Sequence, residues 1–249
     1  MLNRQFGSGD HKVFLSMRSY APGYNFEITL SGQPIAPFRW PGKATVTFGS
    51  AKPEIMQPIP SSTETYGPAI LFVSDIHATA AVGQKADSST HYLYPDLNLE
   101  AHFDGITLAT ASQTLVLETG PMATAMQVLR QCTDDLLKHW GLDPQVQSHL
   151  KRGVTSPNSS SWTKKMSDKY PWDLSRKGLN AVVNIIVIVD QEGRPTKCMI
   201  HKSFTNTQFT DNRCNIIMKY AQFTPALDEQ GNPVPSYIIQ KLVYHIGAW

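Results

Sequence analysis

The sequence AVVNIIVIVDQEGRPTKCMIHK, residues 181–202, carries the clearest structural signal in the C-terminal part of this chain. Its first run, Ala181–Val189, is rich in β-branched side chains, and Pro195–Lys202 forms a second strand-like run. Between them Asp190–Gly193 supplies turn residues, and Gly193 can take the positive φ that a tight turn needs. The stretch therefore predicts an antiparallel β-hairpin.

Further elements on both sides of this hairpin complete a small module over residues 169–249. A short helix is expected before the hairpin at about Pro171–Arg176, and a second helix after it at about Asp211–Tyr220. A last strand is expected at about Pro235–Ile246. Three antiparallel strands with two helices on one face form a two-layer α+β core.

The N-terminal part of the chain has a different pattern, which predicts a β-rich domain over residues 1–118. Short alternating runs are separated there by Pro-Gly and Ser-Gly punctuation. Several short strands at this spacing favour a small sandwich or half-barrel over parallel βαβ units. The runs lie at about Val13–Met17, Phe26–Leu30, Ala44–Phe48, Ala69–Val73, Leu97–Phe103 and Ser112–Leu117.

Between these two regions the sequence predicts a connecting helical segment, residues 119–150, and then a linker, residues 151–168. Pro121 suits the first turn of a helix, apolar residues follow at three-to-four spacing, and Gly141 suits its C-terminal cap. The stretch Lys151–Ser161 is rich in serine and contains glycine and proline, which is the composition of a solvated linker. We expect the domain boundary there.

Composition is that of a folded protein and excludes several function classes. A chain of 249 residues with 41% hydrophobic and 17% charged residues can bury two ordinary cores. A net charge of +2 falls short of the basic surface that nucleic-acid binding requires, so no nucleic-acid partner is expected. No apolar run approaches the ~20 residues of a membrane-spanning helix, so no transmembrane segment is expected in this chain.

The sequence shows no constellation of residues that would carry catalysis. The eight histidines have no i,i+4 pairing and no clustering with cysteine or carboxylate at ligand spacing. Phosphate-binding glycine loops and nucleophile elbows are also missing from the sequence. We expect no enzyme, no catalytic residue, no cofactor and no metal site.

Two of the three cysteines, Cys198 and Cys214, enclose a loop of about fifteen residues. A disulfide closing such a loop would stabilise the fold by roughly 3 kcal/mol in the chain-entropy account. Their spacing does not fit a zinc site. Two buried thiols are the alternative, and spacing alone leaves both readings open.

Particular residues of the C-terminal module, in their order along the chain, point to a known family. They are Tyr170-Pro171, Gly178, Val189-Asp190, Gly193-Arg194, Ser203, Phe223-Thr224-Pro225-Ala226, Gly231 and Pro233-Val234. In this order the module resembles the C-terminal domain of the TonB energy-transducer family. The resemblance implies a non-catalytic domain that captures an extended segment of an outer-membrane receptor by strand addition at its sheet edge.

Carried onto this sequence, the resemblance makes the last strand, particularly Tyr237–Tyr244, the candidate edge. A weaker candidate lies beside it, at Asp168, Tyr170 and Pro171. The alternative is that the last strand only completes the core, which is favoured for the side chains of Ile238, Leu242 and Val243. The candidate binding residues of the strand are Tyr237, Ile239, Lys241 and Val243.

A narrower resemblance reaches beyond the C-terminal module. It rests on Phe6–Asp10, Thr119–Met122, Cys132–Leu137, Trp140-Gly141 and the cysteine pair, which are similar to α-proteobacterial proteins that carry a β-rich region before a TonB-like module. The resemblance implies export to the periplasm. Export implies in turn a disulfide between Cys198 and Cys214.

The start of the chain disagrees with export. Met1–Gly7 lacks the features of a signal peptide, which taken literally predicts a cytoplasmic protein. In the resembling proteins a signal peptide and a cysteine-bearing segment would precede the Arg4–Gly9 motif. We therefore expect that the reading frame starts too late, and the odd Cys132 fits a partner lost with the missing segment.

The function expected from these features is a periplasmic protein-binding module linked to TonB-dependent transport. Its expected partner is a protein, an outer-membrane receptor segment in the first place, and a homodimer stays open. The alternative is an envelope structural or interaction protein with no role in transport. The basic stretch Lys151–Lys177 would suit an acidic partner, against the plainer reading of a solvated linker.

Overall fold

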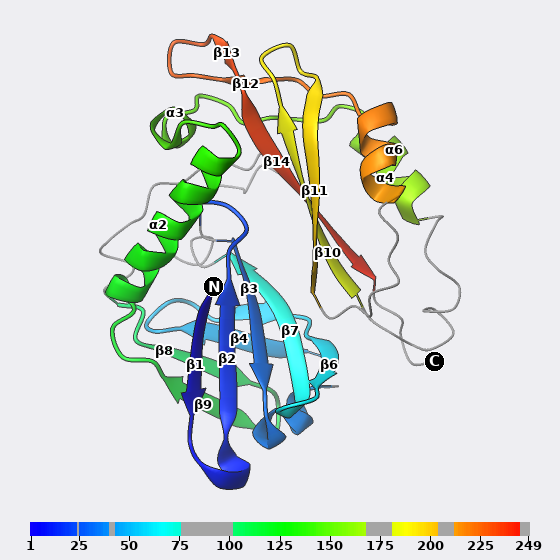
Figure 1. Ribbon diagram of the computed structural model, residues 1–249. Helices are drawn as coiled ribbons and strands as arrows, with labels where there is room; N and C mark the ends of the chain where they lie inside the picture. Colours follow the sequence, from blue (N-terminus) through cyan, green and yellow to red (C-terminus); the bar gives the residue numbers. More distant parts are fainter. Residues whose placement is uncertain (24, 40–42, 76–101, 168–180, 204–211, 245–249) are drawn as a thin grey trace. The chain divides into compact units, whose positions relative to one another are not determined.

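The computed structural model describes the chain except for residues 24, 40–42, 76–101, 168–180, 204–211 and 245–249 (Figure 1). The described residues up to Leu136 form one compact unit, and those from Leu137 on form a second. The architecture is α+β, as predicted, with a β-rich N-terminal unit and a C-terminal unit of strands and helices.

The first unit contains two antiparallel sheets. One has the strand order β1-β2-β3-β7-β6 and the other β5-β4-β8-β9. Short 3-10 helices η1 and η2 lie at Gly9–His11 and Gln33–Phe38. The strands are β1 Leu2–Phe6, β2 Val13–Arg18, β3 Asn25–Ser31, β4 Ala44–Phe48, β5 Glu54–Met56, β6 Ile59–Thr63, β7 Gly67–Asp75, β8 Gly105–Ala109 and β9 Thr114–Glu118.

Both sheets contribute to one hydrophobic core, which is the arrangement of a sandwich. Alternate residues of β2, such as Leu15 and Met17, and of β4, such as Val46, are buried in the same cluster. The period of two is what sends these side chains to one face of each sheet. Helix α2, Ala123–His139, adds Met126 and other residues of its first half to this core.

Several strands of the first unit were expected and others were not. The runs predicted at Val13–Met17 and Phe26–Leu30 lie inside β2 and β3. Strand β1 escaped prediction because its central residues are polar and exposed, so the sequence shows no alternation. The run predicted at Leu97–Phe103 lies largely outside the described residues, and Phe103 itself is not in a strand.

The second unit is built on a three-stranded antiparallel sheet of order β11-β10-β14 (Figure 1). The predicted hairpin is present as β10 and β11, and the predicted last strand as β14. Strands β12 and β13 form a small separate ladder. The elements are α3 Pro144–Ser148, α4 Ser159–Ser167, β10 Ala181–Val189, β11 Pro195–Ser203, α6 Asn212–Tyr220, β12 Ala226–Leu227, β13 Pro233–Val234 and β14 Ser236–Tyr244.

Central strand β10 is buried along both of its faces. Val183, Ile185, Val187 and Val189 face a core that is completed by Trp162 and Met166 of α4, Ile216 and Ile217 of α6, and Leu242 of β14. The alternate residues Val182, Asn184, Ile186 and Ile188 are equally buried. A strand buried on both sides has a nearly continuous apolar sequence, and only Asn184 interrupts AVVNIIVIV.

The segment expected to be a linker, residues 151–168, differs from that expectation in the structure. It carries α4, and its backbone bridges to the strands through Arg152↔Leu227 and Thr155↔Thr224. The serines of α4 had favoured a solvated chain, but Trp162 and Met166, four residues apart, place their apolar side chains in the core. The short helix expected at Pro171–Arg176 lies outside the described residues.

Candidate functional site

Strand β14 lies at one edge of the three-stranded sheet. It pairs with β10 along its whole length, from Ser236↔Val189 to Tyr244↔Ala181. Among the described residues no strand pairs with its other edge. An edge strand carries a row of backbone N–H and C=O groups that an additional strand can join.

The candidate residues of β14 share one face of the strand by their spacing of two. Ile239 and Lys241 are half-buried there, whereas Tyr237 is only 7% exposed. Val243 pairs with Val182 in the register. On the opposite face Leu242 belongs to the core and Ile238 packs against it, so for these two side chains the core-completing alternative holds.

The start of β14 is covered by a segment that lies earlier in the chain. The Trp140 ring meets the Tyr237 ring edge to face, with centroids 5.7 Å apart. In α3 the side chain of Gln147 donates to the carbonyl oxygen of Pro235 at 2.9 Å and accepts from Ser236 Oγ at 2.6 Å. The half-buried part of β14 therefore begins only after Tyr237.

The opposite edge of the sheet, formed by β11, is less suited to strand addition. It begins with Pro195, which has no N–H to donate, and it presents the exposed residues Lys197 and His201. Proline and lysine are the residues by which natural proteins protect sheet edges. Between Ile238 and Tyr244, by contrast, β14 carries a single charged residue, Lys241.

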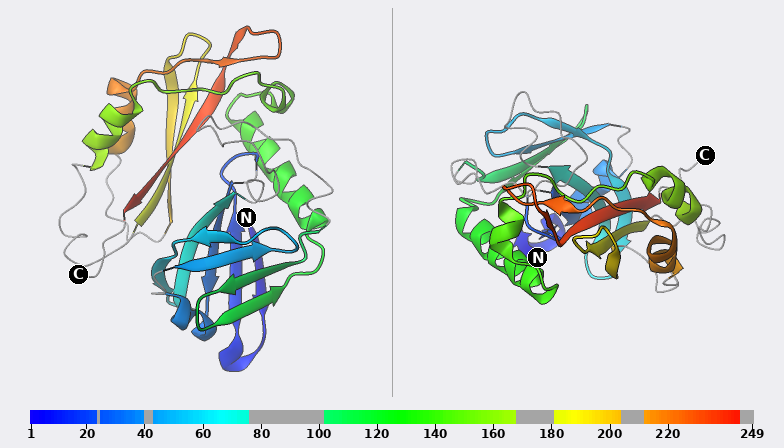
Figure 2. Two further views of the ribbon diagram at one scale, coloured as in Figure 1. Left: turned by 180° about the vertical axis from the view of Figure 1, so that it is seen from behind. Right: turned by 90° about the horizontal axis from the view of Figure 1, so that it is seen from above.

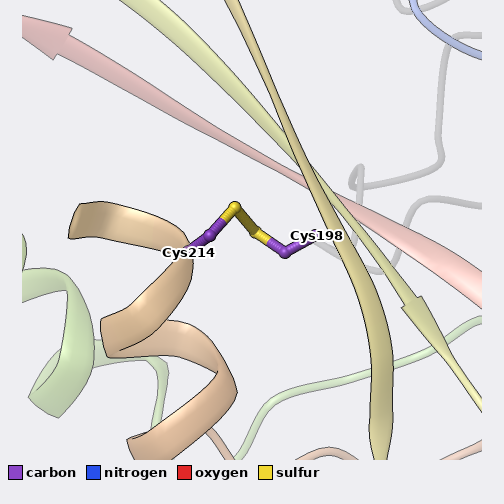
Figure 3. Close-up of a disulfide and its surroundings, with 2 residues drawn as sticks. All are labelled: Cys198 and Cys214. Atoms are coloured by element: carbon purple, nitrogen blue, oxygen red, sulfur yellow. A yellow bond between two sulfur atoms is a disulfide. The ribbon is translucent and has the colours of Figure 1, made fainter. Parts of the chain in front are cut away.

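A disulfide ties β11 to the helix that covers the sheet. Cys198 of β11 and Cys214 of α6 are bonded, with their Cα atoms 5.6 Å apart (Figure 3). The resemblance to exported proteins had implied this pair. The third cysteine, Cys132 on α2, is exposed and free.

The β10–β11 turn is fixed by hydrogen bonds and by a close backbone approach. The carboxylate of Asp190 accepts from the backbone N–H groups of Glu192 and Arg194. Gly193 has φ of 79°, as expected for the turn. A Cβ at this position would lie 2.4 Å from the carbonyl oxygen of Phe223, so glycine lets the turn pack against the chain that leaves α6.

Neither a metal-binding cluster nor a membrane-spanning helix is present in the part of the chain that the structure describes. No group of three or more histidine, cysteine, aspartate or glutamate residues there could hold a metal ion. None of the described helices has the length and apolarity needed to cross a membrane. The weaker candidates Asp168, Tyr170 and Pro171 lie outside the described residues.

Trp140 and Gln147 are the residues at this site that sequence reasoning missed. A local signal for α3 exists, because Asp143 caps its first turn by accepting from the N–H of Gln145 and Pro144 suits its first position. Nothing local indicates that Gln147 binds residues 88 and 89 positions further along the chain.

In the part of the chain that the structure describes, the second unit is thus a small α+β module in which β11 is an edge with proline and lysine and β14 is an edge with no further strand paired to it. Residues 166–246 match the family model described as Gram-negative bacterial TonB protein C-terminal. The match confirms the predicted resemblance for this part of the chain. The narrower α-proteobacterial subgroup stays a prediction.

Domains of this family are non-enzymatic, periplasmic and bind proteins. No curated protein and no solved structure matches the chain. The match does not extend over the β-rich first unit or over Trp140 and Gln147.

Proposed function

We propose that the C-terminal module captures an extended protein segment by strand addition along β14. The observation that carries the proposal is the position of β14, which pairs with β10 on one side only among the described residues. Backbone hydrogen bonds from an added strand would supply affinity, and pockets for alternate side chains would supply specificity. Ile239, Lys241 and Val243 are the binding residues in this proposal.

The proposed setting is the periplasm, and the proposed partner is a segment of an outer-membrane protein. Two observations support it, namely the family match of residues 166–246 and the Cys198–Cys214 disulfide, because disulfides persist in oxidising compartments. Linkage to TonB-dependent transport is part of the proposal. Two outcomes would replace this proposal. One is an envelope interaction with no role in transport, and the other is pairing of β14 with a second copy of this chain.

Capture from an envelope extract tests the proposal through proline substitution in each edge strand. The N–H groups of successive residues of an edge strand point alternately to β10 and outward, so proline at one of two neighbouring positions removes only an outward N–H. Ile239 and Gln240 are the two positions in β14, and Met199 and Ile200, which lie opposite Ile186 and Ile185, are the two in β11. We expect proline at the outward position of β14 to abolish capture and proline at the outward position of β11 to retain it.

Retention of capture by a folded variant that lacks the outward N–H of β14 would argue against strand addition on β14. Retention in the variants of both edges, with unchanged thermal unfolding, would point to a surface other than the two sheet edges. Identification of the captured protein by mass spectrometry then separates a membrane receptor from an envelope protein with no transport role.

A further inference from the structure

The segment Trp140–Gln147 contacts the start of β14 from both of its faces. Successive residues of a strand point to opposite faces, so Ser236 and Tyr237 project in opposite directions. The side chain of Gln147 accepts a hydrogen bond from the hydroxyl of Ser236, while the ring of Trp140 packs on the ring of Tyr237. One short segment therefore reaches both sides of the strand.

The position of β10 determines where this segment can pass. Ser236 and Tyr237 already pair with Val189 and Ile188 of β10, so the inner edge of β14 is occupied at these residues. We infer that the segment passes around the start of β14 on the side away from β10, which no strand occupies among the described residues. Figures 1 and 2 agree with this, since α3 lies beside the start of β14 and away from the β10–β11 hairpin.

The contact is firmly held. Gln147 and Ser236 are each 1% exposed, and the two atoms of the Gln147 amide have separate partners, Pro235 and Ser236. Buried polar groups that are satisfied in this way are costly to separate, because each would be left without a hydrogen bond. The segment is a fixed part of the module and not a loosely lying loop.

We propose that the Trp140–Gln147 segment acts as a stop that limits strand addition to Ile238–Tyr244. This inference rests on the proposed function of β14. An added strand that runs along the open edge meets the stop at Tyr237, so it cannot extend over the first two residues of β14. The stop thereby sets one end of the binding site and limits the registers in which a partner can pair.

The edge of β14 from Ile238 to Tyr244 indicates which kind of segment could be captured. It would pair with about seven extended residues at a rise of about 3.4 Å each. Alternate partner side chains would lie beside the apolar row Ile238 and Leu242 on one face and beside Ile239 and Lys241 on the other. An extended segment with alternating apolar residues and an acidic residue next to Lys241 fits this edge, since opposite charges on neighbouring strands attract.

A tethered strand tests the stop without knowledge of the natural partner. The probe is a nine-residue strand of sequence Thr-Val-Glu-Val-Thr-Val-Glu-Val-Thr, fused to the C-terminus of the full chain. A Gly/Ser linker of about 20 residues has a mean reach of roughly 25 Å, which keeps the probe at high effective concentration. Cross-strand nuclear Overhauser contacts then report which β14 residues the probe pairs with.

In the unmutated chain we expect contacts from Ile238 to Tyr244 and none at Ser236 or Tyr237. In Gln147→Ala, where the stop loses its anchor, contacts should extend by two residues to Ser236. Contacts at Ser236 and Tyr237 in the unmutated chain would overturn the stop and leave strand addition standing. Absence of contacts along all of β14 would overturn strand addition itself. The unmutated chain decides between these outcomes even where the variant fails to fold.

Discussion

The hydroxyl of Ser236 donates a hydrogen bond of 2.6 Å to the side-chain oxygen of Gln147, which lies 89 residues earlier in the chain. Both residues are buried, and the amide nitrogen of Gln147 continues the link to the carbonyl oxygen of Pro235. The module that carries β14 therefore includes residues that precede the family match. The start of β14 is contacted by a segment that lies outside residues 166–246.

Replacing Gln147 by alanine should destabilise the second unit. The substitution removes the hydrogen bond to the Pro235 carbonyl and leaves the buried Ser236 hydroxyl without this partner, which costs roughly 1–3 kcal/mol. Chemical denaturation of the full chain measures the loss. Gln145 is the matched control, because its side chain is exposed on the same short helix, and Gln145→Ala should change stability by less than about 0.5 kcal/mol. Equal effects of the two substitutions would contradict this account of α3.

The hairpin and the two-layer module were predictable because their signals are local. Ala181–Val189 is an apolar run of strand length, and Gly193 marks the turn that follows it. The role of residues 151–168 was not predictable from composition, since Thr155 pairs with Thr224 through backbone atoms that every sequence has. The Gln147 contact was hidden for a related reason, because it depends on which distant elements the fold brings together.

Removal of the disulfide should destabilise the second unit without disturbing the first. In the double variant Cys198→Ala, Cys214→Ala, the unfolded chain is no longer held in a closed loop and gains conformational entropy. The free energy of unfolding should therefore fall by roughly 3 kcal/mol. Urea unfolding followed by signals from each unit measures it. Cys132→Ala should leave the free energy of unfolding unchanged, because that cysteine is exposed and free. A double variant as stable as the unmutated chain would show that the disulfide does not support the fold.

Alanine substitution at two glycines with nearly the same backbone conformation distinguishes the cost of left-handed backbone strain from the cost of steric crowding. Gly193 and Gly141 have φ of 79° and 80°, so alanine at either costs about 1–2 kcal/mol of left-handed strain. Only at Gly193 would the new Cβ meet a backbone atom, the Phe223 carbonyl oxygen, whereas nothing lies within 4 Å at Gly141. We expect Gly193→Ala to be more destabilising by a further ~1–3 kcal/mol. Thermal unfolding of both variants measures the difference, and equal midpoints would refute it.

Acid should weaken the turn that leads into β13. The backbone N–H of Asn232 donates to the Asp228 carboxylate at 2.7 Å, which holds the pKa of Asp228 below its ordinary value. A carboxylate with a lowered pKa stabilises the fold above its unfolded value of about 3.9. That stabilisation is lost as the pH falls through the folded pKa.

NMR titration of the Asp228 carboxyl carbon checks the direction of this pKa shift. The variant Asp228→Asn should lose part of the acid dependence of stability, while Glu229→Gln, an exposed neighbour, should keep it. An Asp228 pKa at or above its ordinary value would contradict the turn geometry.

Strand addition on β14 is tested most directly by proline at two successive positions, Ile239 and Gln240. In an antiparallel pair the N–H groups of successive residues point alternately to the partner and away from it. One of the two substitutions therefore breaks a bond to β10 and lowers the unfolding midpoint, and the other removes only an outward N–H. We predict that the variant with the unchanged midpoint loses capture of the envelope protein. Full capture by that variant would contradict strand addition on β14.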